Sequence, residues 1–174
     1  NRGLLELIEE RWHKAENYLL EGINQSDAPL INYLALAKAA HEQMEYDKRD
    51  MYLHKAHHLA PQADIVIGLV HAQLQLNQGQ LERALATLNH LRTLVPSHPV
   101  VLQLLQKCYT RLGDWQELLK LVPNLRKAKL LMPEHLENLE QHIYQELLNA
   151  KANKTENVKE LYEKGQPTLI GTVS

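Results

Sequence analysis

Histidine offers the first chemistry to consider in this sequence, because the chain contains 10 of them. The densest group is His54, His57 and His58, in a segment with helical spacing. His54 and His58 would lie one turn apart on one face of a helix, where two imidazoles can hold a metal ion. A stable site needs three or four ligands, and no neighbouring cysteine or aspartate completes one. We therefore interpret these histidines as solvated and predict no metal site.

Other residues suggest catalysis only weakly. Cys108 could act as a nucleophile with His98 as its base, but its place in a packing helix predicts a buried, inert thiol. His71 falls in a core register, where a hydrogen-bonded packing role is expected, and the pair Glu9 and Glu10 ends a helix in solvent. The sequence has no glycine-rich phosphate loop, serine-hydrolase turn or metalloprotease pair. We predict a protein without catalytic residues, a metal or a resident cofactor.

The composition of the chain excludes several other classes of protein. The formal net charge is -2 and the predicted pI is about 6.6, which gives no overall field to attract nucleic acid. A single cysteine excludes a disulfide framework and suits a reducing compartment. No apolar run approaches the length of roughly 20 residues that a membrane helix needs. The first residue is Asn1, inside a helical pattern, so we expect a soluble segment of a longer protein.

The elements that carry these residues follow a repeat of 34 or 35 residues. A bulky residue opens the second helix of each unit, and these markers are Trp12, Tyr46, Leu81 and Trp115. Seven residues later an apolar side chain should face the first helix of the same unit, at Leu19, Leu53, Leu88 and Val122. A small residue is expected nine positions before each marker, where the helices cross, and these positions hold Gly3, Ala37, Ala72 and the exception Gln106.

Turn residues fix the limits of the helices. Gly79 and Gly113 can adopt the left-handed conformation two residues before their markers, whereas Met44 and Glu10 fit that turn less well. Pro61 and Pro96 end the second helices. A truncated first helix should end near residue 10, and the others should span 11–24, 29–43, 46–60, 64–77, 80–94, 98–112 and 114–127.

The fold predicted from this pattern is all-α, a tetratricopeptide-type right-handed superhelix of antiparallel helix pairs. Residues 1–131 should form the repeats, the first of them truncated. Residues 132–163 should add capping helices, one from Pro133 to about Leu148 and a short one from Thr155 to about Glu163. Residues 164–174 should form a poorly ordered tail.

The repeat register also predicts a binding surface, because the first helix of each unit lines the concave side of such arrays. The groove should be apolar at one end of each helix and polar at the other, which suits a peptide with acidic groups. It lacks the paired lysine and asparagine positions of the chaperone-tail clamp. The predicted partner-binding residues are Lys38, His41, Glu42, Gln73, Asn77, Gln103, Lys107 and Arg111.

Four stretches of the sequence carry a more specific resemblance. They are NRGLLELIEERWHKAENYLLEG at 1–22, SDAPLINYLALAKAAHEQ at 26–43, HKAHHLAPQADIVIGLVHAQLQLNQGQLERALATL at 54–88 and RLGDWQELLKLVPNLRK at 111–127. Over residues 1–148 the chain resembles the HemY family of proteobacteria. The resemblance implies an inner-membrane protein with two N-terminal membrane helices and a repeat domain on the cytoplasmic face. It also implies a link to late haem biosynthesis.

We therefore expect a non-catalytic scaffold that binds other proteins, including enzymes of the tetrapyrrole pathway, and that binds no nucleic acid. Contact with the membrane should occur only through N-terminal helices outside this chain. A homo-dimer through the terminal helices, near Asn1 and after Pro133, is a further expectation. The alternative function is binding or transfer of haem or porphyrin in the groove, through a histidine, such as His41 or His71, or a tyrosine, with Lys and Arg side chains on the propionates.

Overall fold

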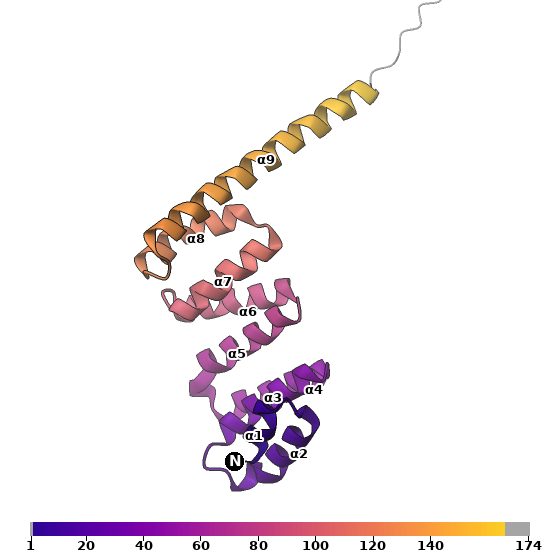
Figure 1. Cartoon of the computed structure of the whole chain (residues 1–174), viewed down its shortest axis with the longest axis vertical. Helices are drawn as coiled ribbons and strands as arrows, with labels where there is room; N and C mark the ends of the chain where they lie inside the picture. Colours follow the sequence, from indigo (N-terminus) through magenta and orange to yellow (C-terminus); the bar gives the residue numbers. More distant parts are fainter. Residues whose placement is uncertain (1, 166–174) are drawn as a thin grey trace, which may run out of the picture.

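The computed structural model describes residues 2–165, and every regular element in that range is helical (Figure 1). The elements are α1 (Arg2–Ile8), α2 (Trp12–Gly22), η1 (Ile23–Gln25), α3 (Pro29–Glu42), α4 (Tyr46–Leu59), η2 (Pro61–Ala63), α5 (Asp64–Asn77), α6 (Leu81–Leu94), α7 (Pro99–Leu112), α8 (Trp115–Lys127) and α9 (Pro133–Gly165). The helix limits predicted between residues 11 and 127 are confirmed to within two residues. No helix in the described range is both long and apolar enough to cross a bilayer.

Consecutive helices pack against one another and build an elongated stack (Figure 1). The odd-numbered helices also touch in order, since α1 contacts α3, α3 contacts α5, and α5 contacts α7. The even-numbered helices do not approach one another as closely within the described residues. Helices α1, α3, α5 and α7 therefore form one continuous layer, here called the inner layer, and each even-numbered helix from α2 to α8 packs against its other side.

The turn inside each helix pair has the same backbone conformation in every pair. The residue at its centre has a positive φ in all four cases: Glu10 at 57°, Met44 at 61°, Gly79 at 80° and Gly113 at 69°. The amide after this residue donates back to the preceding helix, as Glu45 N does to the Ala40 carbonyl at 2.9 Å and Asp114 N to the Tyr109 carbonyl at 3.0 Å. Glu10 and Met44 therefore adopt a left-handed backbone conformation that is unfavourable for residues with a Cβ.

Apolar side chains fill the space between the two layers. The four residues predicted to face the first helix of their unit are buried, with Leu19 1%, Leu53 3%, Leu88 0% and Val122 2% exposed. Gly3 is buried because α2 crosses closely, and an added Cβ would lie 2.7 Å from the Leu19 Cγ. Gln106, the exception in the small-residue pattern, is half-buried at the inner surface.

A polar network joins the second and third helix pairs. Arg49 of α4 is fully buried, where the neighbouring units have Ala15, Ala84 and Leu118. Its Nε donates to the Asp50 carboxylate at 2.7 Å, and its Nη1 donates to the Gln78 side-chain carbonyl at 2.7 Å. The guanidinium also lies 5.3 Å from the centre of the Tyr46 ring. Arg49 therefore ties α4 to the end of α5.

The C-terminal region differs from the prediction, because one helix of 33 residues replaces two shorter ones. Residues 149–154 contain neither glycine nor proline, so nothing stops the helix after Leu148. The Thr155 hydroxyl donates to the Lys151 carbonyl at 3.0 Å, as in a helix interior, and so does not cap a new helix. Residues 166–174 of the predicted tail lie outside the described range.

Candidate functional site

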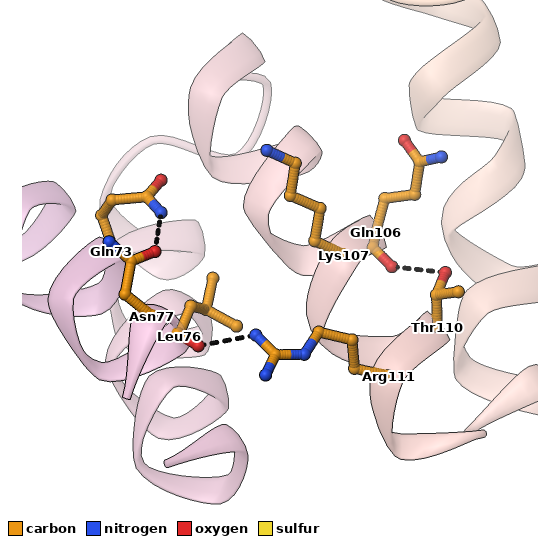
Figure 2. Close-up of a pocket in the computed structure, with 7 residues that line it drawn as sticks. All are labelled: Gln73, Leu76, Asn77, Gln106, Lys107, Thr110 and Arg111. Atoms are coloured by element: carbon orange, nitrogen blue, oxygen red, sulfur yellow. Dashed lines mark hydrogen bonds between the residues drawn. The ribbon is translucent and has the colours of Figure 1, made fainter. Parts of the chain in front are cut away.

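The inner layer presents two adjoining hollows that share Gln73 and Asn77. The first, here called the α5–α7 pocket, has a volume of about 370 Å³ and is shown in Figure 2. Its lining residues are Gln73, Leu76, Asn77, Gln106, Lys107, Thr110 and Arg111. The second, here called the apolar pocket, has a volume of about 340 Å³ and is lined by Lys38, Leu69, Val70, Gln73, Leu74, Asn77, Val100 and Leu104. Together the two pockets form a groove across α3, α5 and α7.

Hydrogen bonds hold the polar side chains of the α5–α7 pocket in place. Arg111 reaches across from α7, and its Nη1 donates to the Leu76 carbonyl at 2.6 Å, near the end of α5 (Figure 2). Gln73 Nε2 donates to the Asn77 side-chain carbonyl at 2.9 Å on the opposite wall. The Lys107 side chain extends from α7 toward the wall formed by α5 (Figure 2). Several hydrogen-bonding groups therefore converge on one hollow.

The charge of the groove is positive. No aspartate or glutamate lines either pocket, whereas Lys38, Lys107 and Arg111 do. Lys38 forms an ion pair with Glu42 one turn further along α3. Lys107 and Arg111 form no ion pair with any described residue. The uncompensated charge is thus concentrated in the α5–α7 pocket.

A row of exposed β-branched residues accompanies the pockets at the other end of the helices. Ile31, Val66 and Val100 occupy equivalent positions in α3, α5 and α7 and are 53%, 51% and 42% exposed. Exposed apolar side chains at one repeat position on three successive helices form a stripe across the inner layer. The groove is therefore apolar near the beginning of each helix and polar near its end.

The structure brings together most, but not all, of the residues predicted for this surface. Lys38, Gln73, Asn77, Lys107 and Arg111 line the two pockets. Gln103 is exposed on α7 but lines neither of them. The Glu42 carboxylate forms an ion pair with Lys38.

The predicted exposure of His41 in the groove is wrong, because this residue is only 8% exposed. Its ring lies edge-on to Tyr46, with 5.9 Å between the ring centres. The start of α4 thus covers a side chain that the repeat register alone places at the surface. Burial lowers the pKa of His41 below the ordinary histidine value.

A second cluster of histidines lies on the opposite side of α5. Successive residues of a helix turn by about 100°, so His71 points away from Gln73 and the groove. His71 lines a hollow of about 340 Å³ together with His54, His57 and His90. No group of three potential ligands within the described residues has a geometry that could hold a metal ion.

The sequence pattern grouped His54 with His57 but did not predict the hollow that brings them together with His71 and His90. Its floor includes Gly68, at the repeat position that Tyr33, Leu102 and Leu136 occupy in other units. An added Cβ at Gly68 would lie 2.8 Å from Leu91 Cδ2, so Leu91 takes part of the space of the missing side chain. The sequence signal that could have predicted this hollow is Gly68, which stands where other repeat units have a bulky residue.

Cys108 and His98 do not form a catalytic pair. The Cys108 thiol is fully buried and donates to the Leu81 carbonyl at 3.2 Å. His98 precedes the first residue of α7, and ten residues of helix correspond to about 15 Å. Burial raises the pKa of the Cys108 thiol, which disfavours the nucleophilic thiolate.

Comparison with known proteins agrees with the sequence resemblance. A family model described as the HemY protein N-terminus matches residues 1–44. The proteins named HemY of Escherichia coli K12, Escherichia coli O157:H7 and Shigella flexneri are each 29% identical over 143 residues, which is 82% of this chain and 36% of each relative. The chain is thus similar to HemY proteins over most of its length.

The chain spans about a third of the length of these HemY proteins, and no solved structure matches it. The family-model match ends in the turn after α3. The 29% identity extends the similarity over most of the chain. The groove on α5 and α7 thus lies beyond the family-model match.

Proposed function

We propose that this chain is part of a HemY-family protein and forms a tetratricopeptide-type superhelix, a non-catalytic scaffold that binds segments of other proteins in its groove. The observation that carries the proposal is the groove itself, where polar side chains with two unpaired cations adjoin a stripe of exposed apolar residues. Surfaces of this mixed character suit a peptide better than a small polar substrate. The repeat of 34 or 35 residues and the continuous layer of odd-numbered helices support the tetratricopeptide assignment.

The cellular setting of the proposal rests on the family. Similarity to HemY supports a place at the cytoplasmic face of the bacterial inner membrane, with tetrapyrrole-pathway enzymes as partners. The membrane anchor would lie outside this chain. The buried Cys108 and its separation from His98 favour binding over catalysis, because a nucleophile needs both access and a base.

Haem binding through histidine in the groove is not part of this proposal. His41 is buried, and His71 lies on the other side of α5. An axial ligand must reach the iron directly. Neither imidazole can do so from the groove in this arrangement.

Affinity capture from solubilised bacterial membranes tests the scaffold proposal. Asn77 lines both pockets, so Asn77→Trp should block the groove whatever the charge of its occupant. Lys55→Trp on the exposed side of α4 is the matched control. We expect a specific protein to be retained by the wild-type chain and by Lys55→Trp and to be lost with Asn77→Trp. Recovery of no specific protein, or undiminished recovery with Asn77→Trp, would refute the proposal.

A further inference from the structure

We infer that the segment bound in the groove is acidic and amphipathic, with carboxylates at Lys107 and Arg111 and apolar side chains over Val66 and Val100. This inference rests on the proposed function and specifies the chemistry of the partner. Two independent features carry it, namely the unpaired charge of the α5–α7 pocket and the exposed stripe beside it.

Lys107 carries a charge in the α5–α7 pocket that has no partner within the described part of the chain. Lys38, the other lysine of the groove, is paired with Glu42, whereas Lys107 has no carboxylate partner among the described residues. A partner that covered this ammonium without supplying an anion would remove it from water uncompensated, which is unfavourable. A carboxylate on the partner removes that cost and adds a charge-assisted hydrogen bond.

Arg111 provides a second cation in the same pocket, and its orientation is fixed by a hydrogen bond. Its bond to the Leu76 carbonyl uses one of the five guanidinium N–H groups and fixes the side chain across the pocket. A carboxylate can therefore meet a guanidinium that is already oriented. Gln73 and Gln106 line the same pocket and can donate amide hydrogens to the oxygens that remain.

The apolar stripe sets the spacing of groups on the partner. Val100 and Lys107 lie seven residues apart on α7, which corresponds to about 10 Å along the helix. An extended chain covers that distance in about three residues. The bound segment should therefore carry an apolar residue about three positions from an acidic one, or about two turns away if the segment is helical.

Selection from a displayed library of random 12-residue peptides tests this chemistry with a defined probe. The immobilised wild-type chain should enrich peptides with at least two acidic residues and an apolar residue at the predicted spacing. Lys107→Glu should weaken binding of the enriched peptides about tenfold or more, as expected for a lost charge-assisted contact. Lys55→Glu makes the same charge change on α4, away from both pockets, and should alter affinity less than twofold. Circular dichroism of each variant verifies folding.

Enrichment of neutral or basic peptides, or equal binding by wild type and Lys107→Glu, would overturn the inference. Loss of binding with Lys55→Glu as well would also overturn it, because the effect would then reflect net charge alone. The capture experiment with Asn77→Trp separates the two proposals. If that variant loses a partner while the selected peptides are not acidic, the groove binds proteins and only the inferred chemistry is wrong.

Discussion

Single residues show how strongly the repeat constrains the backbone. Met44 has a φ of 61° in the turn between α3 and α4, the conformation that glycine adopts in the next two units. The left-handed conformation costs a residue with a Cβ roughly 1 kcal/mol. Met44 is also 76% exposed, so its side chain contributes little packing.

Replacing Met44 with glycine should therefore raise the free energy of unfolding by about 0.5–1 kcal/mol. Urea denaturation followed by circular dichroism measures this change. Gly113→Ala is the reciprocal control and should lower the free energy of unfolding by a similar amount, since Gly113 has a φ of 69°. A destabilised Met44→Gly variant would show that the methionine side chain contributes more than the strain relieved.

Two histidines, the buried His41 and the half-buried His71, make stability depend on pH. Burial lowers the pKa of both His41 and His71 below the ordinary histidine value, against the opposing influence of Glu42 on the first and Asp50 on the second. The unfolded chain then binds more protons than the folded one as the pH falls below about 6.5, so stability should decrease from pH 7 to pH 5. Urea midpoints across this range measure the loss.

The double variant His41→Gln and His71→Gln should flatten that dependence. The exposed residue His13 offers a control, because His13→Gln should leave the slope unchanged. A steep slope that persists in the double variant would assign the effect to other groups.

At the scale of elements, the junction between α4 and α5 depends on Arg49. This side chain fills a buried position and bonds to Asp50 and Gln78. Arg49→Ala should lower the free energy of unfolding by about 3 kcal/mol, because it leaves a cavity and unpaired polar groups.

Arg49→Met should cost less than half as much, since an apolar side chain of similar length can fill the space. Thermal or urea unfolding of the two variants gives the comparison. Equal losses would indicate that the hydrogen bonds of Arg49, and not its volume, hold the junction.

The helices themselves were predictable because proline, glycine and the bulky markers recur at fixed spacing, and Pro29, Pro99 and Pro133 each begin a helix. Most groove residues also followed from the register. The burial of His41 did not, because it depends on the position of Tyr46 in the next helix. The hollow around His71 and His90 depends on packing between α4, α5 and α6, which a repeat pattern does not specify.

At the scale of the whole molecule, α9 divides into a packed and a projecting part. Ile143 is fully buried near α8, whereas every residue from 148 to 164 is exposed, and the helix extends away from the stack (Figure 1). Helix propensity alone then maintains the distal part, apart from weak surface pairs such as Lys164 with Glu160.

Truncation after Asn149 should accordingly change the free energy of unfolding by less than about 0.5 kcal/mol. Ile143→Ala is the contrasting control and should cost about 2–4 kcal/mol, because it opens a cavity in the core. Urea denaturation measures both changes. A large loss on truncation would mean that the distal part of α9 packs against the array or against a second copy.

The groove is the feature on which the functional account depends, and site-specific photo-crosslinking in bacterial cells tests it most directly. A benzoylphenylalanine placed at Gln103 lies on the exposed inner face of α7, and one placed at Lys55 lies on the exposed side of α4. The account predicts a discrete crosslinked protein from position 103, reduced by Lys107→Glu, and none from position 55. A crosslink from position 55 alone, or the same products from both positions, would contradict it.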